Sequence, residues 1–318
     1  MSTKIEWADM TINPVVGCTK CSDGCRSCYA ERFAARMEKH PNPKISSKYA
    51  GVVDENGKWT GRISGMDLSV FNLPRKPQRV FVGSMTDMFH PALDDNEGQG
   101  MRAMLQIFWM YPQHTFMLLT KRPDRMKADV DWLIAQDGDL PENLWLGVTV
   151  CNQAEADAKI PLLLQTPATV RFVSVEPCLG PVDLGHLSWT GIIGSTADKN
   201  ALTGKTWIQG NCGESSQTLQ GNRLDWVICG GETGPGARPM HPDWVRGLRD
   251  QCQGARVPFF FKSWGEWAPN CLCGAKRPHP IIQRPTPGHV GCMFKCGKRR
   301  AGRLLDGREW NEFPEVKA

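Results

Sequence analysis

Short apolar runs alternate with amphipathic segments along most of the chain. The runs are rich in Val, Leu and Phe and occupy residues 11–18, 79–82, 115–120, 144–150, 170–175, 225–231 and 257–263. Between them, apolar residues recur at helical spacing in residues 29–40, 96–112, 130–136, 154–165 and 242–253. Strands that alternate with helices indicate βαβ units, so the pattern predicts an α/β protein with a mostly parallel sheet.

The predicted strands share a second feature, because a polar or charged residue lies at or just beyond the end of each. These residues include Cys18, Asp87, Lys121, Glu176, Glu232 and Lys262. In a parallel barrel the carboxyl ends of all strands open onto one face, which carries the active site. The alternative is an open doubly wound sheet, but the chain has no early G-x-G-x-x-G motif. We therefore expect a partial (βα) TIM-type barrel with about six or seven parallel strands and loop insertions.

Three stretches interrupt this rhythm. Residues 41–77 are rich in Gly, Pro and Lys and predict an irregular excursion. Residues from about 184 to 223 are rich in Gly, Ser and Thr and predict a loop or a small β-flap on the active face. We expect a barrel over residues 1–267 that contains this flap. A cysteine-containing insertion at 268–300 and a tail at 301–318 that packs on the barrel would follow.

Composition and charge narrow the class of protein. The 318 residues carry a formal net charge of +5, which permits an anionic partner without requiring one. The first residues lack a basic stretch followed by an apolar run, and no apolar stretch of about 18 residues occurs. We expect a cytoplasmic protein without membrane contact. Its thirteen cysteines would then be reduced, and clustered ones would bind metal rather than form disulfides.

Four of these cysteines lie on one polar loop, GCTKCSDGCRSCYAE. Two Cys-x-x-Cys pairs, Cys18/Cys21 and Cys25/Cys28, are separated by only three residues. Four thiolates around one tetrahedral zinc are therefore one reading, although the spacing is tight. Three thiolates that hold a [4Fe–4S] cluster with one open iron are the other, and this reading is favoured. The C-x3-C-x2-C spacing of Cys21, Cys25 and Cys28 resembles the motif of the radical S-adenosylmethionine superfamily.

Further motifs carry a second resemblance, over nearly the whole chain. The blocks are NPVVGCTK, GCRSCYAE, SMTDMFH, LTKRPDRM, VSVEP, GGETGPGARPMHPDWVRGLRDQC, PFFFKSWGEW and AGRLLDGREWNEFP. Together they resemble a phage and prophage family of unknown function with a three-cysteine motif. That resemblance places the three shared cysteines at Cys18, Cys25 and Cys28. Cys21 is then the alternative first ligand.

The two resemblances imply a radical S-adenosylmethionine enzyme that generates a 5′-deoxyadenosyl radical from a [4Fe–4S] cluster and S-adenosylmethionine. An electron donor such as a flavodoxin or ferredoxin would supply the reducing electron. The Trp content, the basic segments and the phage association favour modification or repair of a nucleic acid, nucleotide or base. The alternative is a non-catalytic zinc protein that binds nucleic acid or a protein partner.

The strand ends supply candidates for binding the cofactor. The small residues of GSMTD after the second strand match the place where the superfamily meets the methionine amino group, although an ordinary strand-to-helix turn explains them equally. Lys121 and its neighbour Arg122 could pair with a carboxylate or phosphate, and Glu176 suits ribose hydroxyls or a cation. The candidate cofactor-binding residues are Tyr29, Gly83, Ser84, Asp87, Lys121, Ser174 and Glu176.

The candidate catalytic residues are the charged groups at four strand ends. Glu232 lies in the Gly-rich segment GGETGPGARP, where the backbone can approach a ligand closely. Lys262 lies beside Trp264 and Trp267, a pairing that could cradle a base or an anionic substrate. With Lys121 and Glu176 these residues complete the candidate set.

A second group of cysteines lies near the C-terminus. It consists of Cys271, Cys273, Cys292 and Cys296. A structural zinc site is the favoured reading, with His279 and His289 as substitute ligands, and an auxiliary iron–sulfur cluster or free thiols are the alternatives. The basic run Lys295–Arg303 could contact a phosphate backbone or form a solvated charged face.

Overall fold

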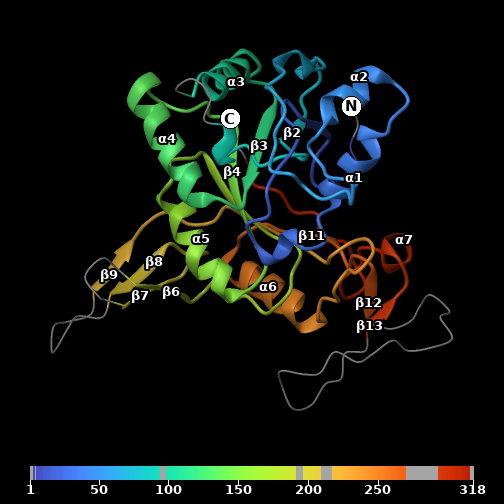
Figure 1. Ribbon diagram of the computed structural model, residues 1–318. Helices are drawn as coiled ribbons and strands as arrows, with labels where there is room; N and C mark the ends of the chain where they lie inside the picture. The colour runs from blue at the N-terminus through green and yellow to red at the C-terminus, as the bar shows by residue number, and fades with distance from the viewer. Residues whose placement is uncertain are drawn as a thin grey trace. The chain divides into compact units, whose positions relative to one another are not determined.

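The computed structural model describes residues 3, 5–93, 98–190, 196–208, 217–269 and 293–315 (Figure 1). Seven strands form the main sheet: β1 (Met10–Ile12), β2 (Arg79–Val82), β3 (Thr115–Thr120), β4 (Leu144–Val150), β5 (Val170–Val175), β10 (Trp226–Gly230) and β11 (Phe259–Ser263). The strands are parallel, and their spatial order β1-β2-β3-β4-β5-β10-β11 follows their order along the chain. A doubly wound sheet would reverse its order at a switch point, whereas a (βα) barrel adds each strand on the same side. The predicted α/β fold of the partial-barrel type is therefore confirmed.

Helices separate the strands as the apolar spacing predicts. They are α1 (Tyr29–Glu38), α2 (Pro43–Tyr49), α3 (Gln99–Met110), α4 (Pro123–Asp137), α5 (Gln153–Gln165), α6 (Pro242–Ala255) and the short α7 (Lys298–Ala301). Two small antiparallel sheets complete the described structure. One contains β6 (Leu187–Thr190), β7 (Thr196–Lys199), β8 (Lys205–Ile208) and β9 (Gln217–Gln220), and the other contains β12 (Trp267–Pro269) and β13 (Met293–Lys295).

Two local predictions need correction. The first strand ends at Ile12 rather than continuing to Cys18, because Pro14 has no N–H to donate to a neighbouring strand. The stretch 41–77 is not wholly irregular, because it contains α2. Asn42 caps that helix by accepting a hydrogen bond from the Lys44 backbone N–H, and Pro43 occupies the first turn, where its missing N–H costs nothing.

The chain divides into two compact units. The first comprises Met1–Val148 and Gln165–Val170, and the second comprises Thr149–Leu164 and Arg171–Ala318. In the first unit the rings of Phe108 and Phe116 stack with centroids 4.0 Å apart. This contact joins α3 to β3, and both rings are fully buried, so each contributes about 2–3 kcal/mol of hydrophobic free energy.

An aromatic cluster forms the core of the second unit. Every residue of β10 is buried, and the Trp226 ring on this strand contacts Phe172, Phe260 and Phe313. The Trp226 indole N–H donates to the carbonyl of Glu312 at 2.9 Å. The C-terminal residues therefore belong to the core of this unit.

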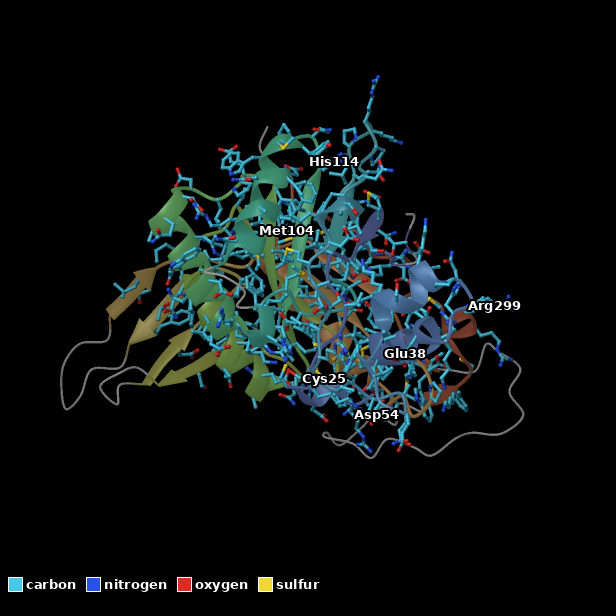
Figure 2. All side chains as sticks on the ribbon, turned by 45° about the horizontal axis from the view of Figure 1, so that its top comes forward. Cys25, Glu38, Asp54, Met104, His114 and Arg299 are labelled. Carbon is cyan, nitrogen blue, oxygen red and sulfur yellow. The ribbon has the colours of Figure 1, made fainter. Side chains whose placement is uncertain are left out.

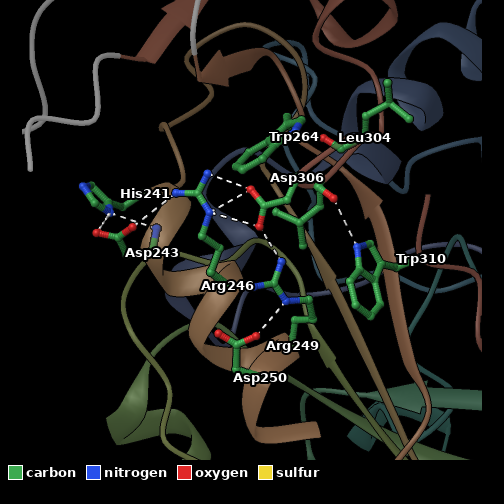
Figure 3. Close-up of polar contacts among 10 residues, drawn as sticks. His241, Asp243, Arg246, Arg249, Asp250, Trp264, Leu304, Asp306 and Trp310 are labelled. Atoms are coloured by element: carbon green, nitrogen blue, oxygen red, sulfur yellow. Dashed lines mark hydrogen bonds and ion pairs between the residues drawn. The ribbon is translucent and has the colours of Figure 1, made fainter. Parts of the chain in front are cut away.

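The same C-terminal segment lies along β11. The Phe261 N–H donates to the Trp310 carbonyl at 3.0 Å, and Phe260 pairs with Asn311 in an antiparallel bridge. An ion-pair network ties the segment to α6, because Asp306 accepts hydrogen bonds from Arg246 and Arg249 (Figure 3). The block AGRLLDGREWNEFP thus has a structural role at the last strand of the sheet.

Candidate functional site

The cysteine loop follows β1 and is bonded to the turn that follows β2. The Gly17 N–H donates to the Met85 carbonyl at 3.1 Å, and the Thr86 hydroxyl donates to the Gly17 carbonyl at 2.7 Å. Gly17 has a φ of +104°, and a Cβ atom there would lie 2.3 Å from the carbonyl oxygen of Arg62. Only glycine fits this position, so the residue before Cys18 has a fixed backbone course.

Thr19, between the first two cysteines, is held by two side chains from other elements. The Arg122 guanidinium donates to the Thr19 carbonyl at 3.0 Å and to its hydroxyl at 2.7 Å. His90 Nδ1 accepts from the Ala92 N–H at 3.1 Å, so the proton lies on Nε2, which donates to the Thr19 hydroxyl at 2.9 Å. These contacts anchor the loop beside Cys18 to the ends of β2 and β3.

Asp87 holds Arg122 in place. Its carboxylate accepts hydrogen bonds from the Thr120 hydroxyl at 2.7 Å and from the Lys121 N–H at 3.0 Å. It also accepts from Arg122 Nη1 at 3.0 Å and the Phe89 N–H at 3.1 Å. The Asp87 and Arg122 side chains are 8% and 10% exposed, so this pair is buried and extensively hydrogen-bonded. Asp87 therefore supports the cysteine loop through Arg122, whereas its predicted contact with a cofactor stays a prediction.

A buried carboxylate fixes the other side of the loop. Glu31, in the first turn of α1, is only 2% exposed. It accepts from the Trp59 N–H at 3.0 Å and pairs with Lys20 of the cysteine loop at 3.1 Å and with Lys58 at 3.5 Å. The segment 41–77 is thereby joined to the loop that carries the thiols.

The four loop thiols form two electrostatically linked pairs. The thiols of Cys21 and Cys25 share a hydrogen bond, which with burial raises the pKa of Cys21. The same hydrogen bond and the charge of Lys121 lower the pKa of Cys25 to about 5. Burial, the carboxylate of Asp87 and the neighbouring Cys28 raise the pKa of Cys18 to about 11. Figure 2 labels Cys25 on the dark blue N-terminal part of the chain.

The loop offers four thiols, a donor type that serves both iron–sulfur clusters and zinc. Among the residues described, no three His, Cys, Asp or Glu side chains converge on the position of a single metal ion. In a [4Fe–4S] cluster each thiolate binds a different iron, so the sulfurs surround the cluster rather than one ion. Three of the four thiols are partly buried and Cys21 is exposed. The cations of Arg122 and Lys121 lie close enough to act on the thiol pKa values, as suits an anionic cluster.

Two further predicted residues meet at the edge of this loop. The hydroxyl of Tyr29, the first residue of α1, donates to the Ser84 carbonyl at 2.7 Å. The Ser84 hydroxyl donates to the Asn13 side chain at 3.1 Å, and Gly83 lies buried at the end of β2. Tyr29 is 48% exposed. The residues predicted from GSMTD therefore lie beside the cysteine loop.

In the second unit, Glu176 is the centre of a separate polar group. Its carboxylate lies 3.0 Å from Lys262 Nζ and accepts from the Ser174 hydroxyl at 3.0 Å. A Cβ atom on Gly230 would lie 2.5 Å from Glu176 Oε1, so a larger residue at the end of β10 would displace this carboxylate. Ser174 on β5, Glu176 just after this strand and Lys262 on β11, all predicted from the sequence, are thus brought together.

Glu232 forms a second ion pair in this unit. The Arg238 guanidinium binds its carboxylate with two hydrogen bonds of 2.7 and 3.0 Å, and the Arg238 backbone N–H donates a third at 2.8 Å. Glu232 is only 5% exposed. The buried ion pair therefore joins the two ends of the Gly-rich segment between residues 232 and 238. Trp264 is buried, and its indole N–H donates to the Leu304 carbonyl at 2.9 Å; it therefore packs in the core.

The remaining cysteines differ from those of the loop. Cys151, Cys178, Cys229 and Cys252 are buried, as expected for small apolar side chains. Of the second predicted group, Cys271, Cys273 and Cys292 lie outside the described residues, as do His279 and His289. Cys296 is buried after β13, and its N–H donates to the Glu266 carbonyl at 3.0 Å. The zinc prediction stays a prediction.

The sequence did not single out three residues that support the loop, namely Thr19, Glu31 and His90. Each lies within a quoted motif, GCTK, CYAE and MFH, and all three are tied to the loop by the hydrogen bonds and ion pairs described above. For Thr19 and Glu31 the available signal was a polar residue beside clustered thiols, because a loop without an apolar core needs polar anchors; His90 lies far along the chain and gave no such signal.

Comparisons with known proteins show the family but assign no activity. Residues 2–314 match the family described as "Protein of unknown function (DUF5131)", and the chain belongs to this family. The comparisons with curated proteins and with solved structures found no match. Among the described residues, no helix is both long and apolar enough to cross a membrane.

Proposed function

We propose that this protein is an iron–sulfur enzyme of the radical S-adenosylmethionine type. The observation that carries the proposal is a four-thiol loop anchored through Thr19 to a buried Asp87–Arg122 pair at the ends of β2 and β3. Cys18, Cys25 and Cys28 would hold a [4Fe–4S] cluster, and Cys21 is the alternative to Cys18. When bound, the cluster and S-adenosylmethionine would supply one-electron cleavage and hydrogen abstraction.

The residues beside the loop have binding and orienting roles in this proposal. The Tyr29–Ser84 contact fixes the turn after β2, whose backbone oxygens suit the amino group of the methionine moiety. Lys121, which acts on the pKa of Cys25, suits its carboxylate. The Arg122–Thr19 bonds keep Cys18 in place while a ligand enters or leaves.

The polar residues of the second unit have binding roles in the proposal. The Glu176 carboxylate, held by Lys262 and Ser174, suits ribose hydroxyls, and Lys262 suits an anionic substrate. Glu232 with Arg238 shapes the Gly-rich segment. The substrate class favoured by the sequence is a nucleic acid, nucleotide or base, with a flavodoxin or ferredoxin as electron donor.

The experiment is anaerobic reconstitution with iron and sulfide, followed by dithionite and S-adenosylmethionine. We expect a brown protein with an iron–sulfur electron paramagnetic resonance signal, and release of 5′-deoxyadenosine and methionine. A Cys25→Ala variant should lose both, whereas Cys252→Ala, at a buried cysteine outside the loop, should keep both. A colourless protein that binds zinc stoichiometrically would overturn the proposal and favour a non-catalytic zinc protein.

A further inference from the structure

A basic surface lies on the turn and short helix that follow β13. It consists of Lys295, Arg299 and Arg300, which we call the β13–α7 basic surface. All three residues are exposed, and none has an acidic partner among the described residues. Arg300 uses its Nε to donate to the Cys296 carbonyl at 2.8 Å, which leaves its two terminal nitrogens available. Arg299 is labelled in Figure 2.

The acidic residues of the adjoining segments are already engaged. Asp306 accepts from Arg246 and Arg249, and Glu309 pairs with Arg303 at 3.7 Å. Glu266 Oε1 accepts from the Gly234 N–H at 2.9 Å. Asp306 and Glu309 therefore offset other cations, and Glu266 is engaged by a backbone N–H, so none of the three pairs with Lys295, Arg299 or Arg300 among the described residues.

An aromatic side chain shares a face with this surface. Trp267 on β12 pairs directly with Lys295 on β13 in the antiparallel register, and directly opposite residues project to the same side of a hairpin. The Trp267 indole N–H donates to the Ala237 carbonyl at 2.7 Å, so the ring is held in one orientation and is partly exposed. A fixed indole beside unpaired cations combines the two contacts that nucleic acids use, base stacking and phosphate pairing.

We propose that the β13–α7 basic surface binds the phosphate backbone of a nucleic acid. Unpaired Lys and Arg side chains gain most from a polyanion, because binding releases the counterions condensed on it. The proposal deepens the proposed function by naming a contact surface for its substrate class. Only the identification of the bound nucleic acid as the substrate rests on the proposed function, because binding to this surface needs no cofactor.

The test is fluorescence anisotropy of the full chain with a labelled mixed-sequence DNA duplex, and with its single strand, between about 50 and 200 mM salt. The test variant is Lys295→Gln with Arg299→Gln, since no hydrogen bond or ion pair holds either side chain within the described structure. The matched control is Lys44→Gln with Arg75→Gln, two exposed cations of the first unit. Both variants lose two positive charges and keep the sequence otherwise unchanged.

We expect the test variant to bind the duplex about tenfold more weakly at 0.1 M salt, with a salt slope smaller by about 2. The control should bind like the parent chain. Equal loss in both variants, an unchanged slope, or binding to phosphatidylserine vesicles but not to DNA would overturn the proposal.

A Cys25→Ala chain separates this proposal from the proposed function. It should bind the duplex normally even though it cannot carry the cluster. Normal 5′-deoxyadenosine release without DNA binding would reject the surface and keep the enzyme. DNA binding by a chain that never incorporates iron would reject the enzyme and keep the surface.

Discussion

Two sets of cysteines in this protein have the same side chain and opposite surroundings. The loop set, Cys18, Cys21, Cys25 and Cys28, lies on a polar segment held by Arg122, His90 and Glu31. The buried set, Cys151, Cys178, Cys229 and Cys252, lies in the interior of the second unit. Exposure and charged neighbours therefore distinguish the loop thiols from thiols that fill a core, although the side chain is the same.

The pKa values separate one loop thiol, Cys25, from the buried set, whereas burial raises the pKa of Cys18 as it does in the buried set. Burial raises the pKa of Cys229 and of Cys252, so both remain neutral thiols at physiological pH. In the loop, Cys21 and Lys121 lower the pKa of Cys25. Thiolate is the form that binds iron or zinc, and Cys25 is the loop thiol whose lowered pKa puts it in that form near neutral pH.

The largest expected effect is on iron content. Cys28→Ala removes a proposed ligand from the loop set, and reconstituted iron should fall to near background because only two of the three proposed ligand positions, Cys25 and either Cys18 or Cys21, would remain for a [4Fe–4S] cluster. Chemical analysis of iron and sulfide per protein chain measures the cluster content. The matched change Cys229→Ala should leave the iron content intact, and equal iron loss in both variants would remove the distinction between the two sets.

The next effect concerns the anchor of the loop. Arg122→Met leaves the buried Asp87 without its cation, although three other hydrogen bonds remain. We expect a loss of about 3 kcal/mol in the free energy of unfolding, measured by urea denaturation.

The control for this variant is Lys127→Met, which breaks the Lys127–Asp131 pair of α4. This pair lies on the surface and spans four residues of one helix, so its loss should cost less than about 0.5 kcal/mol. Similar losses in the two variants would show that the Asp87–Arg122 pair does not hold the loop.

A smaller effect is expected in alkylation of the metal-free protein by iodoacetamide. At pH 7 Cys25, with a pKa of about 5, is thiolate, whereas Cys18, with a pKa of about 11, is neutral. A low-pKa thiolate is a weaker nucleophile, which offsets part of the difference, so we expect Cys25 to react at least about tenfold faster.

Peptide mapping by mass spectrometry at several pH values measures these rates. The Cys25 rate should be flat above about pH 6, and Cys21→Ala should move its midpoint upward by removing the hydrogen bond that lowers the pKa. Identical profiles for Cys18 and Cys25 would contradict the assigned environments.

The smallest effect is on the stability of the buried set. Cys252→Ala leaves a small cavity and should cost about 1 kcal/mol in urea denaturation. Cys252→Ser should cost more, because it buries a hydroxyl, whereas Cys21→Ser at the exposed loop position should cost almost nothing. A large loss of unfolding free energy in Cys21→Ser would mean that this thiol is packed in the folded protein rather than accessible to a ligand.

The fold could be predicted because its signals are local. Runs such as TFMLLT and VRFVSV bury their side chains in strands, as their composition indicates. The exceptions were also local: Pro14 shortened β1, and the Asn42 cap started a helix in a segment whose Gly and Pro content predicted none.

The candidate site could be predicted only in part. The cysteine cluster and Lys262 were found because clustered thiols and a Lys after three Phe are unusual in sequence. The partners of Thr19 could not be found, because Arg122 and His90 lie far away along the chain and meet it only through the tertiary fold. The bidentate Glu232–Arg238 contact likewise depends on the turn between them.

The C-terminal segment that pairs with β11 has a consequence for handling the protein. β11 is the last strand of its sheet, and unpaired edge groups invite strands from other molecules. The bridge from Phe260 to Asn311 and the bond from Phe261 to Trp310 occupy part of that edge. A chain truncated before Arg303 would therefore be prone to aggregate through the exposed edge of β11, even if its cysteine loop were intact.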